Sequence, residues 1–170
     1  MVAQHQELWT YMPTPARTLG EMTAFLNRAI QWGVEGTGQY FVQCDAVTGE
    51  VIGGTGYLNA EHSHRRVEIG GTWVTPARQR TPVNTEAKLL MLRYAFESLG
   101  CIRVEFKVDS LNTRSLAALL RIGAQQEGTL RNHMVMSDGR LRHSVYFSVI
   151  QENWLDVAAR LEALLHRPLI

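Results

Sequence analysis

Apolar residues recur at three- to four-residue intervals in four stretches of the chain, which is the spacing of an amphipathic helix. These stretches predict helices over residues 18–33, 82–99, 112–122 and 152–166. Thr18 followed by Glu21 has the capping-box pattern at the start of the first helix. Thr81 and Pro82 fit the N-cap and the first helical position of the second. The last stretch predicts an amphipathic helix near the C-terminal end.

Strands are predicted where apolar residues alternate with polar ones or form short β-branched runs. They are expected over residues 40–44, 51–58, 67–74 and 101–109, with two more on either side of the turn at 137–140. The first three should form an antiparallel meander, and residues 67–109 a parallel strand–helix–strand crossover. The order α-β-β-β-α-β-α-β-β-α predicts one α/β domain over residues 1–170, a mixed sheet with helices packed on it.

Composition narrows the function classes. The 170 residues carry 17 Lys and Arg against 16 Asp and Glu, a net charge of +1, which argues against nucleic-acid binding through a basic face. No apolar run approaches the roughly 20 residues that span a bilayer, and Met1–Glu7 lacks the pattern of a signal peptide. Cys44 and Cys101 have no zinc-site spacing. We expect no membrane, no metal and a reducing, cytoplasmic setting.

The stretch Thr75–Asn84 joins a predicted strand to a predicted helix N-terminus and carries Arg78 and Arg80. Free backbone N–H groups, the helix dipole and two guanidinium groups suit a phosphate or pyrophosphate. The alternative is a surface turn with solvated arginines. The GxxxxGK[ST] pattern of a P-loop is absent.

A second stretch, Asp109–Ser115, opens the third helix. Asn112 and Ser115 stand at its N-cap and third position, and helix capping alone explains them. Because both stretches follow successive strands of one crossover unit, we expect them to meet at a shared ligand crevice.

Glu68 is the candidate general base, because a carboxylate beside a crevice can take a proton directly or through water. Simple alternation places Glu68 and Gly70 on one face of the strand and Ile69 and Gly71 on the other. The alternative is a structural carboxylate paired with one of three arginines: Arg65, Arg66 or Arg103.

Two further side chains have open roles. His133 is either a substrate-binding or proton-transferring residue or a strand residue facing solvent. Trp73 either lines the crevice or packs in the core. A serine nucleophile and a dinucleotide site are disfavoured, since neither G-x-S-x-G nor a helix-opening G-x-G-x-x-G is present.

Several segments in the same order resemble the GNAT acyltransferase superfamily, especially its branch that acetylates the N-termini of ribosomal proteins. They are VEIGGTWV (67–74), VNTEAKLLML (83–92), AFESLG (95–100), RVEFKVDSLNTRS (103–115), LRIGA (120–124), EGTLR (127–131), DGRLR (138–142) and LWTYM (8–12). The resemblance covers about residues 7–154. It implies a sheet that splays between two central parallel strands, with acetyl-CoA entering the opening.

The resemblance also implies roles for residues. Backbone groups of Trp73 and Val74 would meet the pantetheine arm, and the Val74 N–H would stabilise the oxyanion. The cofactor's pyrophosphate would lie on Arg78, Arg80, Thr81, Val83 and Asn84, and Asn112 and Ser115 would contact the cofactor from the next helix. The acceptor, which would be a protein N-terminal amine or a small amine, would contact Trp9, Tyr11 and His133. Glu68 would be the base, and no metal is needed.

Three departures from the family pattern keep other functions open. Arg80 and Pro82 stand where glycines are common, and Leu119 stands where many members have a tyrosine general acid. The family's first strand has no counterpart before the aromatic segment, so either this strand is absent or the start of the sequence is incomplete. A sheet edge left bare would favour pairing with another chain, such as a second copy of this one. The alternatives are a non-catalytic CoA-binding module and an interaction domain that has lost the cofactor.

Overall fold

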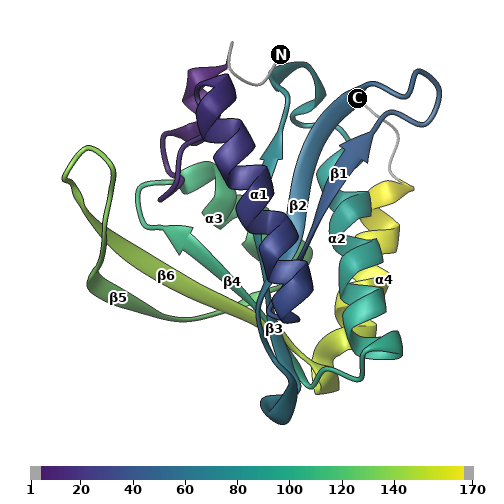
Figure 1. Ribbon diagram of the computed structural model, residues 1–170. Coiled ribbons are helices and arrows are strands. Elements are labelled where there is room, and N and C mark those ends of the chain that lie inside the picture. Colours follow the sequence, from purple (N-terminus) through teal and green to yellow (C-terminus); the bar gives the residue numbers. More distant parts are fainter. Residues whose placement is uncertain (1–4, 167–170) are drawn as a thin grey trace.

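The computed structural model describes residues 5–166. The helices are α1 (Leu19–Glu35), α2 (Val83–Arg93), α3 (Thr113–Ile122) and α4 (Trp154–Leu165). The strands are β1 (Gln39–Cys44), β2 (Val51–Glu61), β3 (Arg66–Val74), β4 (Arg103–Asp109), β5 (Gln125–Val135) and β6 (Leu141–Ile150). They form one mixed sheet in the order β1-β2-β3-β4-β6-β5, so the predicted fold class and the predicted order of elements are confirmed (Figure 1).

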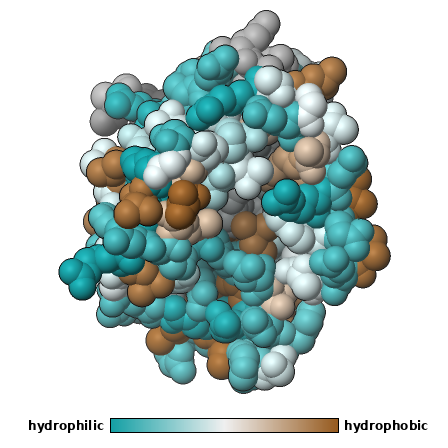
Figure 2. Space-filling model, turned by 60° about the vertical axis from the view of Figure 1, so that its left-hand side comes forward, coloured by the Kyte–Doolittle hydropathy of each residue, from teal (hydrophilic) through white to brown (hydrophobic). Residues whose placement is uncertain are grey.

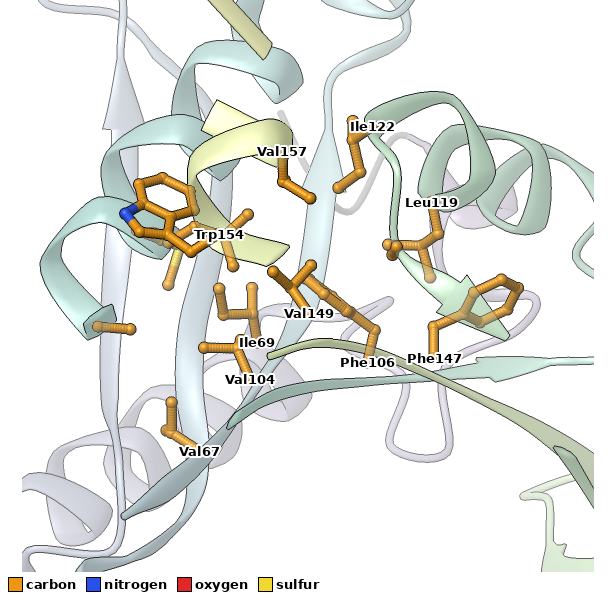
Figure 3. Close-up of a cluster of buried hydrophobic side chains, with 14 of the residues drawn as sticks. Val67, Ile69, Val104, Phe106, Leu119, Ile122, Phe147, Val149, Trp154 and Val157 are labelled. Carbon is orange, nitrogen blue, oxygen red and sulfur yellow. The ribbon is translucent and has the colours of Figure 1, made fainter. Parts of the chain in front are cut away.

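The helices cover the sheet unequally. Side chains of α2, α3 and α4 form the main core with one face of β3, β4 and β6, where Leu119 and Ile122 lie in the same cluster as Phe106 and Phe147 (Figure 3). On the other face, Phe25 of α1 packs edge-on against Tyr40 of β1, with ring centroids 5.0 Å apart. The sheet therefore has an α2 side, which is a closed apolar core, and an α1 side.

Local sequence signals explain some helix ends better than others. Thr18 and Glu21 form the predicted capping box, and Gly36 ends α1 in the left-handed conformation. Thr81 is not the N-cap of α2. Pro82 holds that position without a side-chain cap, because the Thr81 hydroxyl donates to the Arg78 carbonyl, 2.7 Å away.

The helix predicted over 82–99 is regular only to Arg93 and continues as a π-turn from Tyr94 to Ser98.

The parallel pairing of β3 with β4 is short. It joins residues 66–68 to residues 103–105, although β3 continues to Val74 and β4 to Asp109. Beyond Glu68 and Glu105 the two strands are no longer paired with each other (Figure 1). Beyond this point β3 is still paired with β2, and the backbone groups that it directs away from β2 meet no neighbouring strand.

A bulge in β3 alters the alternation expected from the sequence. Gly71 has φ +61° and is the extra residue between the pairs Gly54–Trp73 and Gly56–Gly70. A Cβ at Gly71 would meet the Tyr40 ring at 3.0 Å, so Gly71 lies on the α1 side with Gly70, and not on the side of Ile69 as simple alternation predicts. The Tyr40 hydroxyl donates to the Gly71 carbonyl at 2.7 Å and holds the bulge in place.

Within residues 5–166 no strand precedes α1, and β1 is an edge strand. Residues 1–4, which belong to the Met1–Glu7 segment compared above with a signal peptide, lie outside the described residues. In the described part no helix is long and apolar enough to cross a bilayer.

The bulge makes Gly71→Ala a specific test of this architecture. An alanine at φ +61° is strained and would press on the Tyr40 ring. We expect a loss of about 2 kcal/mol in the free energy of unfolding, measured by urea denaturation. Gly128→Ala is the matched control, because a Cβ there meets nothing within 4 Å. Equal stability of the two variants would contradict the bulge.

Candidate active site at the separation of β3 and β4

The end of β3 presents unpaired backbone donors. The Thr75 N–H donates to the Ile52 carbonyl at 2.9 Å, and Gly54 is paired with Trp73. Because hydrogen-bonded and non-hydrogen-bonded pairs alternate along antiparallel strands, Trp73 directs its backbone groups to β2. Thr72 and Val74 therefore direct their N–H groups away from β2, to the side where β4 has separated. The sequence predicted backbone contacts from Trp73 and Val74. In this geometry Val74 has a free donor and Trp73 does not. Thr72 has one as well, which was not predicted.

The loop after β3 leads to the N-terminus of α2. Since Pro82 has no side-chain cap, the N–H groups of the first helical turn are left for another acceptor, such as a phosphate oxygen. Asn84 lies in this turn, and its Oδ1 is buried without a hydrogen-bond partner. That acceptor would suit an amide N–H or hydroxyl of an elongated ligand.

The two predicted arginines of the loop differ. The Arg78 guanidinium donates to the Asp45 carboxylate at 2.6 Å, which ties the loop to the turn between β1 and β2. Arg80 is exposed and has φ +62°, a conformation that favours glycine. Arg80 therefore adopts a backbone shape that glycine takes most easily, while adding a positive charge.

The two predicted loops do meet. Arg114 of α3 donates to the Gln79 side-chain oxygen, and the Gln79 amide donates to the Val74 carbonyl at 3.1 Å. Asn112 caps α3 by accepting from the Ser115 N–H at 3.1 Å, so the capping interpretation is confirmed for this pair. Gln79 thus links the end of β3 to the first turn of α3.

Glu68 is buried on the α1 side of β3, with 6% of its surface exposed. Its Oε2 accepts from Asn59 Nδ2 at 2.8 Å and from Lys107 Nζ at 3.2 Å. None of the three arginines predicted as alternatives pairs with it: Arg66 and Arg103 bind Glu105 instead, and the ion pairs of the described residues include none with Arg65. Glu68 is therefore held in place by one amide and one ammonium.

The other polar groups on this face form a chain. The His133 imidazole lies 2.9 Å from the Ser144 hydroxyl, which also accepts from Arg142 at 3.1 Å. Arg142 is buried and donates to the Tyr11 carbonyl at 3.3 Å, so it fastens the segment before α1 to β6. Burial, and then the cations Lys107 and Arg142, hold the pKa of His133 below its usual value. His133 is therefore favoured in its neutral form.

Trp9 and Trp73 pack against each other. Their ring centroids are 6.2 Å apart, and together with Ala16 they form a second small core against α1. Trp9 is only 1% exposed, so its side chain is placed to hold the segment that carries Tyr11 and not to touch an acceptor directly. Trp73 likewise belongs to the core.

Lys88 is the ionisable side chain that the sequence analysis missed. It lies in α2 among apolar residues and is 5% exposed. Its Nζ donates to the Thr72 hydroxyl at 2.9 Å and to the Thr55 hydroxyl at 3.4 Å, and it lies 6.0 Å from the centroid of the Phe106 ring. Burial lowers the pKa of this ammonium to about 7. In the sequence, Lys88 is one polar residue within an amphipathic helix pattern, and this pattern gave no indication that its side chain is buried.

Taken together, the free donors lie at the end of β3, where the strands separate, and at the N-terminus of α2, one loop further along the chain. Two backbone N–H groups, a buried acceptor on Asn84 and an uncapped first turn fit an elongated ligand with amide groups and phosphates. Figure 2 shows a mostly hydrophilic face that is hollowed near its middle, and hydrophobic side chains are visible inside this hollow. No group of His, Cys, Asp and Glu that could hold a metal occurs among residues 5–166.

These features define a mixed α/β domain whose two central parallel strands separate beside an uncapped helix N-terminus. Residues 1–125 match the family described as "Acetyltransferase (GNAT) domain". The chain belongs to this family, and the resemblance seen in the sequence is confirmed.

Individual relatives agree with this assignment. The uncharacterized N-acetyltransferase YoaA of Bacillus subtilis is 32% identical over 120 residues, which are 71% of this chain and 62% of YoaA. A GCN5-related N-acetyltransferase from Brucella melitensis has a TM-score of 0.84 at 30% identity, covering 94% of this chain and 71% of that one. Mycobacterium smegmatis RimJ in complex with CoA-disulfide has a TM-score of 0.78 at 26% identity, covering 95% and 78%. The chain thus spans less than two thirds of YoaA.

The left-handed conformation of Arg80 can be separated from its charge by two substitutions. Arg80→Gly and Arg80→Ala both remove the guanidinium, but only glycine relieves the strain at φ +62°. We expect the glycine variant to be the more stable by about 1 kcal/mol in thermal or urea unfolding. An alanine variant at least as stable as the glycine variant would contradict the loop conformation.

Proposed function

We propose that the protein transfers an acetyl group from acetyl-CoA to a primary amine, by direct attack and without a covalent enzyme intermediate. The observation that carries the proposal is the presence of free donors both at Thr72 and Val74 of β3 and at the uncapped N-terminus of α2, which one loop joins. Membership of the GNAT family and a RimJ neighbour whose structure holds CoA-disulfide support the same cofactor. When bound, acetyl-CoA would supply the activated acyl group.

The residues divide into holding and reacting groups. The first turn of α2, with Val83 and Asn84, and the cations Arg78 and Arg80 would hold the phosphates. Thr81 would act through the loop, because its hydroxyl is bonded to the Arg78 carbonyl. The N–H of Val74 would hold the arm. Asn112 and Ser115 would shape the same region from α3, where Gln79 and Arg114 join the two loops.

Thr72 is better placed than Val74 to supply the oxyanion donor. The base takes a proton from the amine that attacks the acyl carbon, and the oxyanion donor holds the oxygen on that carbon. Both groups therefore have to lie near the same carbon. At about 3.3 Å per residue, Val74 is roughly 20 Å of extended strand from Glu68, whereas Thr72 is closer and the bulge shortens the path further. We assign the acyl carbonyl to the Thr72 N–H and the arm to Val74.

Glu68 would accept the proton of the attacking amine, directly or through one water. Its carboxylate is fixed by Asn59 and Lys107, both bonded to Oε2. Oε1 lies on the Gly70 side, where a Cβ would stand 3.0 Å from it. One carboxylate oxygen is therefore held by the protein and the other is directed to the glycines of β3.

We infer an amine acceptor that lies on the α1 side, between Glu68, Tyr11 and His133. The resemblance to the ribosomal-protein branch, together with a relative named putative ribosomal N-acetyltransferase YdaF of Bacillus subtilis, favours the N-terminal amine of a protein, such as a ribosomal protein. A small amine is the alternative. We further propose a cytoplasmic enzyme that pairs through the edge strand β1, where Phe41 and Val42 are exposed.

Isothermal titration with acetyl-CoA tests the binding step. We expect one site per chain in the micromolar range, followed by turnover in a screen of amines and N-terminal peptides. Binding without turnover would favour a non-catalytic CoA-binding module. Absence of binding at millimolar concentration would favour an interaction domain.

Glu68→Gln tests the base. We expect kcat to fall by about 10² or more while acetyl-CoA binding is unchanged, because only proton transfer is removed. Glu105→Gln is the matched control, since Glu105 faces Glu68 in the β3–β4 register and pairs with Arg66 and Arg103. A loss of less than about threefold in Glu68→Gln would exclude Glu68 as the base.

A further inference from the structure

Lys88 is a buried ammonium that no part of the proposed function uses. Desolvation of a charge is costly, and an apolar residue would fill the same space at lower cost. The groups at its Nζ are the Thr72 and Thr55 hydroxyls and the Phe106 ring, and the ion pairs of residues 5–166 include none with Lys88. Perturbed ionisable groups of this kind are concentrated at functional sites.

Three charged groups of the neighbouring helices have partners other than Lys88. Arg121 of α3 donates to the Thr85 hydroxyl at 2.9 Å, and Glu162 of α4 accepts from Arg93 of α2 at 2.8 Å. Burial is the cause that lowers the pKa of Lys88 to about 7. The ammonium therefore loses its proton near neutral pH because of where it lies and not because a second charge opposes it.

The position of Lys88 is as informative as its burial. Thr72 lies on β3 directly after the bulge, and its N–H is our oxyanion donor. Phe106 is the first residue of β4 beyond the last β3–β4 pair, Glu68 with Glu105. Lys88 Nζ thus lies on the α2 side of the sheet where the two strands separate, next to the residue that would hold the acyl carbonyl.

The same region lacks the proton donor that the family resemblance leads one to expect. Leu119 stands at the corresponding position of α3 and is buried in the apolar core with Phe106 and Phe147 (Figure 3). Glu68, on the opposite face, would be receiving a proton. The proton for the leaving sulfur then has to come from another group or from water.

We propose that Lys88 protonates the sulfur of CoA as the acetyl group leaves, an assignment that rests on the proposed acetyltransferase function. The amine nitrogen forms the new C–N bond and gives one proton to Glu68. The C–S bond breaks with its electron pair on sulfur, and Lys88 Nζ gives that sulfur one proton. Neutral Lys88 regains a proton from solvent after CoA leaves, and Glu68 returns its proton to solvent, so the cycle balances.

Two substitutions separate charge from proton donation. Lys88→Met keeps the length of the apolar stem and removes a buried charge, so the fold should be retained. Lys88→Arg keeps the charge but does not release its proton at accessible pH. We expect kcat to fall about tenfold or more in both variants, with acetyl-CoA affinity unchanged by titration.

The pH profile gives a second readout. Lys88 must be protonated to act, so wild-type kcat should decline as pH rises through the Lys88 pKa. That alkaline limb should be absent from both variants.

A third readout does not depend on activity. The chain has two lysines, Lys88 and Lys107, so lysine-selective ¹³C labelling gives two side-chain signals, and the one missing from Lys88→Met is that of Lys88. If Nζ meets the sulfur, the pKa of Lys88 should be higher with CoA bound than with desulfo-CoA bound. Equal pKa values would show that Lys88 does not contact the sulfur.

The outcomes distinguish the two proposals. Wild-type protein that does not bind acetyl-CoA would overturn both. Wild-type turnover with unchanged kcat in Lys88→Met would overturn the role of Lys88 alone. Should Lys88→Met fail to fold, Lys88→Arg and the wild-type comparison of CoA with desulfo-CoA decide the question.

Discussion

The short parallel pairing of β3 with β4 is the constraint on which the site depends. Three residues of each strand are paired, and both strands then continue without one another. Continued pairing would consume the N–H groups of Thr72 and Val74 in the sheet. The separation leaves them as donors, and the main core of α2, α3 and α4 holds the strands in this arrangement.

The bulge at Gly71 gives the two faces of the sheet different chemistry. It turns Thr72 toward Lys88 on the α2 side and Trp73 toward Trp9 on the α1 side. Glu68 and the chain from His133 to Arg142 lie on the α1 side. In our account, the amine gives up its proton on one face and the sulfur receives one from the other, so base and acid do not neutralise each other.

The sequence predicted what local rules decide. Element order follows from apolar spacing, and the caps of α1 and α3 follow from Thr18, Glu21 and Asn112. The meeting of two loops followed from their positions after successive strands. The partners of Glu68, the burial of Lys88 and the face of Gly71 were not predictable. They depend on contacts between residues such as Glu68 and Lys107, which are distant in the chain, and on one extra residue that reverses the alternation.

The central claim is that acetyl-CoA lies along the separated end of β3 and the first turn of α2. Amide hydrogen exchange with and without acetyl-CoA tests it most directly, because it reports on each backbone N–H. The account predicts slower exchange at Thr72, Val74 and the first turn of α2 when acetyl-CoA is bound. Protection confined to the surface cavity of about 230 Å³ beside His62 and Cys101 would contradict it.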